Sequence, residues 1–135
     1  MNEQAQAIFA ENVIGVLATV NEDGSPWATP LHIVADDAAL YWFSAADRAH
    51  SANVVRDSRV HMTLFSPDTS GGLKGVYVSG SAELLDAAGH AATHELLTKR
   101  LGTVPPAFAG WDAYRLPIGT LDEQKSTGSC WYFYS

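Results

Sequence analysis

The stretch with the clearest potential for chemistry runs from Ser44 to Arg59, where hydroxyl, guanidinium and imidazole side chains lie close together in the sequence. Ser44 ends an apolar run, Arg48 follows in a short polar segment, and His50 stands where a helix is expected to begin. The first N–H groups of a helix have no partner within it and carry partial positive charge, so proteins hold phosphates there. The pattern predicts a phosphate site, and a plain helix cap with solvated charges is the alternative.

Other reactive residue types give weaker patterns. His90 and His94 could place two imidazoles on one helix face, as a metal site needs, but no third ligand is indicated by spacing. A solvated helix face is therefore favoured, and no metal is predicted. Cys130 has no base nearby in the sequence, which favours a buried structural cysteine over a nucleophile. The familiar phosphate-loop, GxGxxG, HExxH and GxSxG motifs do not occur.

Aromatic residues gather in two expected strands, Trp27 in one and Tyr41, Trp42 and Phe43 in the next. Core packing accounts for most of them. Successive residues of a strand point to opposite sides, however, so some of these rings must face a pocket or a partner chain.

Composition limits the class of protein. The chain has 135 residues, 8 Lys and Arg against 15 Asp and Glu, and a formal net charge of −7, which argues against a nucleic-acid reader. One cysteine excludes an intrachain disulfide and fits a reducing cytoplasm. The N-terminal segment does not resemble a signal peptide, and no apolar run reaches the roughly 18 residues of a membrane helix. We expect a single cytoplasmic domain over residues 1–135, with no membrane partner.

Apolar periodicity and turn residues divide the chain into short elements. Helices are predicted at residues 2–12, 47–57 and 87–101, and strands at 15–20, 27–34, 39–44, 59–65, 75–85, 111–121 and 129–134. Six or seven strands with two or three helices predict an α+β fold, a small antiparallel barrel or sandwich with helices at its ends.

The order of these motifs resembles the opening half of the pyridoxamine 5′-phosphate oxidase-like family, the flavin-binding split β-barrels. The resemblance covers roughly residues 8–86, and the last fifty residues agree only in layout. It implies a mostly antiparallel split β-barrel of six to seven strands with two to three peripheral helices. The pieces that carry it are Gly24-Ser25-Pro26, Ala28-Thr29-Pro30, Leu40 to Ser44, His50 with Asn53, Asp57-Ser58-Arg59-Val60, and the segment GLKGVYVSGSAELL.

The resemblance implies an FMN site in which Ser44 and His50 fall at the phosphate. His50 replaces a lysine of the true oxidases, and Arg48 is expected to supply the missing cation. Asn53 follows one helical turn later on the same face. Phe43 joins these residues as an aromatic candidate at the end of its strand.

The resemblance also implies that four further residues lie near the flavin ring. Thr29 and Leu31 lie on the strand that lines the isoalloxazine and are expected to contact it through their backbone. Lys74 is expected near the pyrimidine edge of the flavin. FMN sites of this family lie between two subunits, so Trp131 is expected to reach the flavin of a partner chain.

The resemblance therefore implies a homodimeric FMN-dependent oxidoreductase that transfers hydride to or from an unknown small molecule. The residues that hold pyridoxal phosphate in the true oxidases are not found, so flavin binding is favoured over pyridoxamine phosphate oxidation. Two alternatives stay open. One is a binding protein for a flavin, F420 or haem without turnover, with His50 as a haem ligand; the other is a cofactor-free dimeric interaction module.

Overall fold

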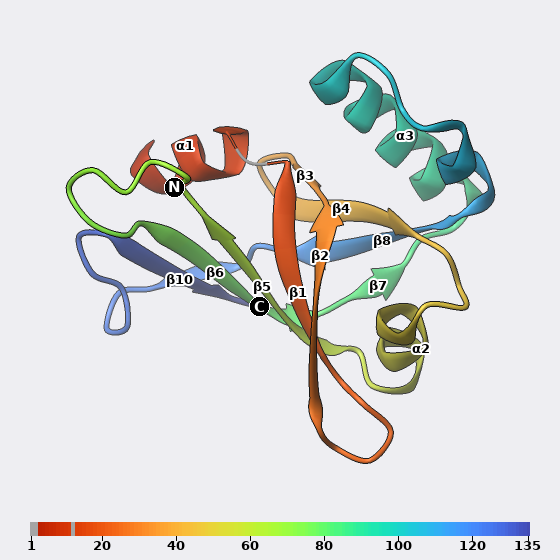
Figure 1. Ribbon diagram of the computed structural model, residues 1–135, viewed down its shortest axis with the longest axis horizontal. Coiled ribbons are helices and arrows are strands. Elements are labelled where there is room, and N and C mark those ends of the chain that lie inside the picture. Colours follow the sequence, from red (N-terminus) through yellow and green to blue (C-terminus); the bar gives the residue numbers. More distant parts are fainter. Residues whose placement is uncertain (1–2, 12) are drawn as a thin grey trace.

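Two β-sheets packed against each other form the framework of the computed structural model, which describes residues 3–11 and 13–135 (Figure 1). The six-stranded sheet has the order β2-β1-β5-β6-β10-β9, and the four-stranded sheet has the order β3-β4-β8-β7. The sheets do not close on each other, so the fold is the predicted α+β split barrel. The strands are β1 Ile14–Val20, β2 Pro26–His32, β3 Val34–Ala35, β4 Ala39–Ser44, β5 Arg59–Phe65, β6 Gly75–Ser81, β7 Glu83–Leu84, β8 Asp112–Pro117, β9 Thr120–Asp122 and β10 Cys130–Tyr134.

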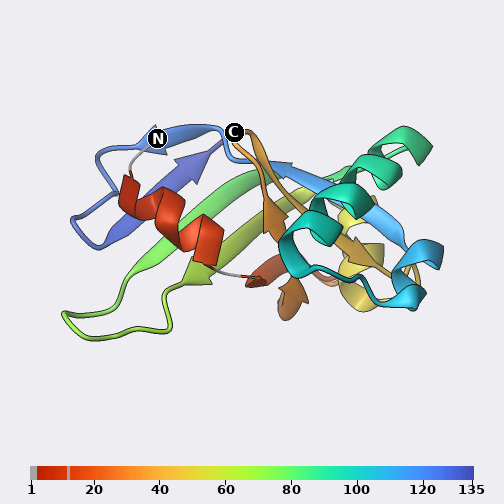
Figure 2. The ribbon, with the colours of Figure 1, turned by 90° about the horizontal axis from the view of Figure 1, so that it is seen from above.

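Helices lie at the ends and edges of the two sheets. They are α1 Glu3–Glu11, α2 Ala49–Arg56, α3 Ala87–Leu101 and the short 3-10 helix η1 Pro106–Gly110. Figure 2 shows α1 over the left half of the molecule and α3 over the right half. In the part of the chain that the structure describes, no helix is long and apolar enough to cross a membrane.

Pairing within the six-stranded sheet is antiparallel except between β6 and β10. The β1–β2 hairpin turns through Gly24, whose φ of 86° needs a glycine, and the Asp23 carboxylate accepts bonds from the Ser25 N–H and hydroxyl. Strand β10 instead runs parallel to β6, with Cys130 opposite Gly75 and Tyr134 opposite Ser79. It enters the sheet between β6 and β9.

Three segments predicted as single strands pass from one sheet to the other. The break between β2 and β3 falls at Ile33, that between β6 and β7 at Ala82, and that between β8 and β9 at Ile118 and Gly119. Ile33, Ala82 and Ile118 are buried and belong to the main core. Each bend thus places an apolar side chain between the sheets, so that hydrophobic burial continues through the corner.

Two hydrophobic clusters fill the interior. The main one lies between the sheets around Leu17, Trp42 and Met62, which are fully buried, and α1 covers one end of it through Phe9, whose ring packs on Phe133 at 6.0 Å. The second lies under α3, and its buried members are Val34, Phe43, Leu97, Phe108 and Ala113.

Candidate functional site

A cavity of about 690 Å³ opens between the edge strand β2, the end of β4, the start of α2, and the segment from η1 to β8. Its volume falls in the range of roughly 300–1,000 Å³ found for cofactor and small-molecule pockets. In Figure 1 the end of β4 leads through a loop into α2, beside the β1–β2 hairpin. The lining residues are Trp27, Thr29, Pro30, Leu31, His32, Phe43, Ser44, Ala45, Arg48, Ala49, His50, Pro105, Phe108 and Trp111.

Polar groups meet at the end of this cavity formed by β4 and α2, which we call the anion end (Ser44, Arg48, Ala49 and His50). Ser44 and His50 are 3% and 8% exposed, and the Ser44 hydroxyl is hydrogen-bonded to Nε2 of His50. Arg48 precedes the helix in extended conformation, and no side chain caps its N-terminus. The first N–H groups of α2 are therefore left for water or a ligand.

The anion end has a cation at Arg48 and not at His50, although His50 stands where the true oxidases have a lysine. Burial, with a smaller contribution from the Arg48 charge, lowers the pKa of His50 below its ordinary 6.5. His50 is then neutral at pH 7 and contributes a hydrogen bond to Ser44. Arg48 is exposed and enters none of the ion pairs found among the described residues. It is the cation of this end.

The free edge of β2 forms one wall of the cavity. Ile33 N–H bonds to the Val13 carbonyl, and in an antiparallel pair such bonds recur at every second position. Leu17 lies opposite Thr29, and Gly15 lies opposite Leu31. The backbone N–H and C=O groups of Thr29 and Leu31 therefore point towards β1 and are paired with it. The outward-pointing backbone groups belong to Ala28, Pro30 and His32. This corrects the expectation of backbone contacts from Thr29 and Leu31, which line the cavity but have no free backbone groups there.

Another part of the cavity lining is aromatic. We call it the aromatic end (His32, Phe43, Pro105, Phe108 and Trp111). Phe108 stacks on Trp111 with ring centroids 4.7 Å apart and meets Phe43 at 5.7 Å and His32 at 6.5 Å.

Helix α3 holds the aromatic end in place. Nε2 of His90 donates to the Trp111 carbonyl at 2.8 Å, and the His90 ring meets Phe43 edge-on at 4.7 Å. Because a carbonyl only accepts, this bond places the proton on Nε2. His94 lies 6.4 Å from Phe43. The described residues contain no group of three or more His, Cys, Asp or Glu side chains that could hold a metal.

Three predicted site residues lie away from the cavity. Asn53 is 4% exposed and donates to Thr19 at 3.0 Å and to Asn21 at 2.9 Å, so it ties α2 to β1. Lys74 is exposed at the end of the β5–β6 loop. Trp131 is 4% exposed in the main core and does not line the cavity.

The structure therefore brings together Thr29, Leu31, Phe43, Ser44, Arg48 and His50. Sequence reasoning missed Phe108 and Trp111, which reach the cavity only because α3 and η1 fold over β4. Pro105-Pro106 followed by two aromatics was the available signal, but it carries no spacing that points to a ligand.

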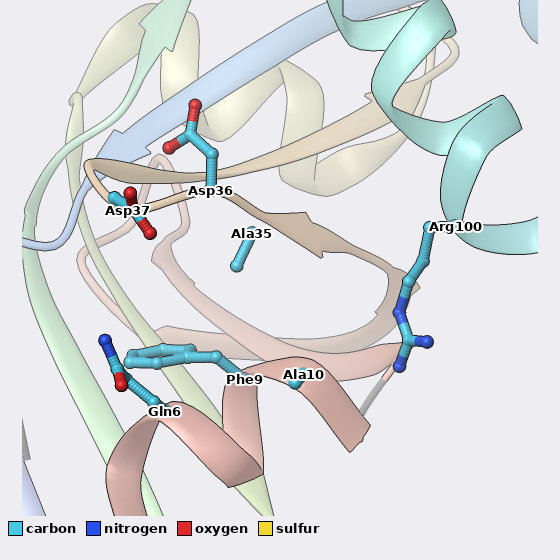
Figure 3. A pocket seen from close by; sticks show the side chains of 7 residues that line it. All are labelled: Gln6, Phe9, Ala10, Ala35, Asp36, Asp37 and Arg100. Atoms are coloured by element: carbon cyan, nitrogen blue, oxygen red, sulfur yellow. The ribbon is translucent and has the colours of Figure 1, made fainter. Parts of the chain in front are cut away.

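A second cavity, of about 460 Å³, lies between α1, the β3–β4 turn and the end of α3. Figure 3 shows Asp36 and Asp37 on the turn and Arg100 reaching from α3 towards the end of α1. The Asp36 carboxylate already accepts bonds from the Ala38 and Ala39 N–H groups and from the Tyr41 hydroxyl. These bonds give Asp36 a structural role in the turn.

Comparison with known proteins gives one family and several similar folds. The sequence pattern of the family described as pyridoxamine 5′-phosphate oxidase matches residues 1–113. A search of curated proteins gave no match.

Three solved structures illustrate the shared fold. A heme binding protein from Mycobacterium smegmatis has a TM-score of 0.75 and 21% identity over 84% of this chain, which spans about half (49%) of that protein. A FAD-binding protein from Mesorhizobium loti has a TM-score of 0.66 and 23% identity, covering 89% of this chain and 91% of that one. An F420 reductase has a TM-score of 0.69 and 22% identity, covering 87% and 94%.

Proposed function

Because the chain belongs to the pyridoxamine 5′-phosphate oxidase family, we propose that it binds FMN in the cavity beside α2 and acts as an FMN-dependent oxidoreductase on a small molecule. The observation that carries the proposal is the donor set of the anion end. It combines the Ser44 hydroxyl, the Arg48 guanidinium and the uncapped N–H groups of α2. Hydroxyl, guanidinium and helix N–H groups are the donors with which proteins hold phosphate.

The residues present fit such a cofactor. Arg48 and the start of α2 would hold the phosphate, while the His50 bond orients the Ser44 hydroxyl. The outward backbone groups of Ala28 and His32 on β2 offer hydrogen bonds to the polar edge of a ring. When bound, FMN would supply hydride chemistry, and the chain supplies anchoring and orientation.

Similar structures widen the choice of cofactor, because by name they include a FAD-binding protein, an F420 reductase and a heme binding protein. One observation speaks against haem ligated through His50. Nε2 of His50 is engaged by Ser44, so coordination of iron through this atom would break a buried hydrogen bond. F420 carries phosphate as FMN does, and the titration below includes it.

A homodimer is the second part of the proposal, and the outer face of the six-stranded sheet supports it. Strand pairing aligns the side chains of this face in two rows, each of which crosses five strands. Neither row contains Asp, Glu, Lys or Arg. Helices α1 and α2 contact the opposite face through the Phe9–Phe133 and Asn53–Thr19 pairs. The rows, which we call the outer face, are Pro30, Val16, Thr63, Tyr77 and Tyr132, and Ala28, Ala18, His61, Ser79 and Tyr134.

The experiment is a titration of the purified protein with FMN, followed by quenching of flavin fluorescence, with parallel titrations of F420 and haemin. We expect saturation at one FMN per chain with micromolar or tighter affinity. Arg48→Ala should weaken FMN binding by about 1.5–3 kcal/mol, the value of a hydrogen bond to a charged group. Arg100→Ala removes the same charge outside this cavity and is the matched control.

The titrations distinguish the position of the phosphate site and the identity of the cofactor. FMN binding that Arg48→Ala and Arg100→Ala leave equally strong would place the phosphate away from the anion end. Absence of FMN binding, together with saturation by F420 or by haemin, would replace the flavin proposal by that cofactor. Reduction of bound FMN by NADH or NADPH would then be tested, because an oxidoreductase must exchange electrons with its flavin.

A further inference from the structure

The aromatic end lies in the same cavity as the anion end and differs from it in chemistry. Its rings come from β2, β4 and the segment around η1, and they contact each other. The phosphate donors stand at the end of β4 and the start of α2. The cavity therefore offers a second set of contacts that phosphate anchoring does not use.

Charge limits what this end can bind. Among all residues that line the cavity, Arg48 alone carries a formal charge, and the anion end uses it. The aromatic end has no Lys or Arg, and the chain has a formal net charge of −7. An anionic group there would lose its hydration without gaining a Lys or Arg partner.

Shape favours a planar ligand. Phe108 and Trp111 stack with an interplanar angle of 27°, and Phe43 tilts against Phe108 at 45°. Aromatic rings bind planar rings by offset stacking or edge-to-face contact, beyond the burial of apolar area.

The arrangement is also fixed before any ligand binds. Phe43 and Phe108 are 4% and 6% exposed within the second hydrophobic cluster, and His90 holds the Trp111 carbonyl. A preformed wall loses little side-chain entropy when a ring docks against it.

We propose that the aromatic end is the substrate subsite and takes the uncharged planar ring of an aromatic substrate. The substrate role rests on the proposed FMN function. Binding of such a ring does not, and can be measured without FMN.

The test compares 2-naphthol, which is neutral at pH 7, with 2-naphthoate, an anion of similar shape. We expect 2-naphthol to bind at least about tenfold more tightly in calorimetric titrations, since the anion would be desolvated without a cation to pair with. In nitrogen-15 spectra the indole N–H signal of Trp111 should shift on binding. That of Trp131, buried in the main core, should stay in place.

Variants separate ring stacking from general packing. Phe108→Leu keeps an apolar side chain but removes the ring, and should weaken 2-naphthol about three- to tenfold. Phe108→Ala should weaken it further. Leu73→Ala, which trims an exposed apolar side chain in the β5–β6 loop, should leave 2-naphthol binding unchanged.

The result that overturns the proposal is equal or tighter binding of 2-naphthoate, an unshifted Trp111 signal, or unchanged affinity in Phe108→Leu. FMN titrations of the same variants keep the two proposals apart. Weaker 2-naphthol binding with intact FMN binding in Phe108→Leu supports the subsite. Failure of the wild-type chain to bind FMN contradicts the proposed function and leaves the ring-binding measurement standing.

Discussion

Arg48 and His50 are two residues apart and both face the cavity, but their surroundings differ. The Arg48 side chain is exposed and charged, whereas His50 is buried, bonded to Ser44, and has its pKa lowered by burial. Arg48 would therefore act on an anion through charge, and His50 through the direction of the Ser44 hydroxyl.

Salt dependence should separate these two contributions. We expect Arg48→Ala to weaken FMN binding and to flatten its decline between about 0.05 and about 0.5 M NaCl, because exposed charges are screened over this range. His50→Ala should weaken binding by about 0.5–1.5 kcal/mol, as for a neutral hydrogen bond, with the wild-type salt dependence intact. Fluorescence titrations at several salt concentrations measure both. A flattened curve in His50→Ala would mean that His50 binds FMN as a cation.

Histidine burial also predicts how stability changes with pH. Burial lowers the pKa of both His50 and His61 in the folded protein below their ordinary value of 6.5. As pH falls below about 6.5 the unfolded chain takes up these protons first, so the free energy of unfolding should decrease from there towards the lowered pKa values.

Urea unfolding between pH 8 and pH 5 measures this slope. The double variant His50→Gln/His61→Gln should flatten it, and an unchanged slope would contradict the assignment. Hydrogen bonds lower the pKa of Asp57 to about 2, and the carboxyls of Asp23 and Asp68 also fall below their usual 3.8. These groups titrate below this window and do not confound the comparison.

The site residues that could be predicted from the sequence are those that lie close together along the chain. Ser44, Arg48 and His50 lie within seven consecutive positions at one strand–helix junction, so their meeting could be predicted. Phe108 and Trp111 join them only through tertiary packing. The pattern also could not show that Asn53 would bond to Thr19 and Asn21 and so be withdrawn from the cavity.

At the scale of elements, the strands that bend between sheets set the shape of the barrel. The sequence predicts the bounds of β4, β5 and α3 as observed, because each has one clear period and a distinct end. It merges β2 with β3, β6 with β7, and β8 with β9. Ile33, Ala82 and Ile118 continue the apolar pattern through each bend, so no break in polarity marks the corner.

The corner after β8 also has a strict steric requirement. Gly119 has a φ of 74°, and a Cβ at this position would collide with the backbone carbonyl of Tyr134. Gly119→Ala should lower the free energy of unfolding by at least about 2 kcal/mol, through backbone strain and the clash together. Urea denaturation measures it.

Gly128→Ala is the matched control. No atom lies within 4 Å of a Cβ built there, and its φ is not in the left-handed region. The control should change stability by less than about 0.5 kcal/mol. Equal stability of the Gly119 and Gly128 variants would mean that the corner relaxes around the added methyl group.

At the scale of the whole molecule, the outer face determines the proposed assembly. Tyr77 stacks on Tyr132 at 4.5 Å, and His61 is bonded to Ser79 at 2.7 Å, so these four side chains are held against one another on this face. Ile14, Phe65 and Tyr134 are about half exposed around it. A face without Asp, Glu, Lys or Arg and rich in tyrosine is typical of an interface between copies of one chain.

A single charge at the centre of the outer face tests the homodimer. Thr63→Lys should shift the protein from twice its 14.5 kDa chain mass to the monomer mass in sedimentation velocity, because a lysine buried there would have no partner. Thr69→Lys in the exposed β5–β6 loop adds the same charge and should stay dimeric. A monomeric wild-type chain, or a dimeric Thr63→Lys variant, would contradict the proposed interface.

The parallel pairing of β10 with β6 has a consequence for biosynthesis. As the chain leaves the ribosome, β6 pairs first with β5 and leaves its other edge without hydrogen-bond partners. Its partner on that side is the last of the described strands to be made, and it must insert beside β6 after β7, α3, β8 and β9 have emerged. Between the synthesis of Ser81 and that of Tyr134 the nascent chain thus carries an open strand edge, a feature that makes folding intermediates prone to aggregation.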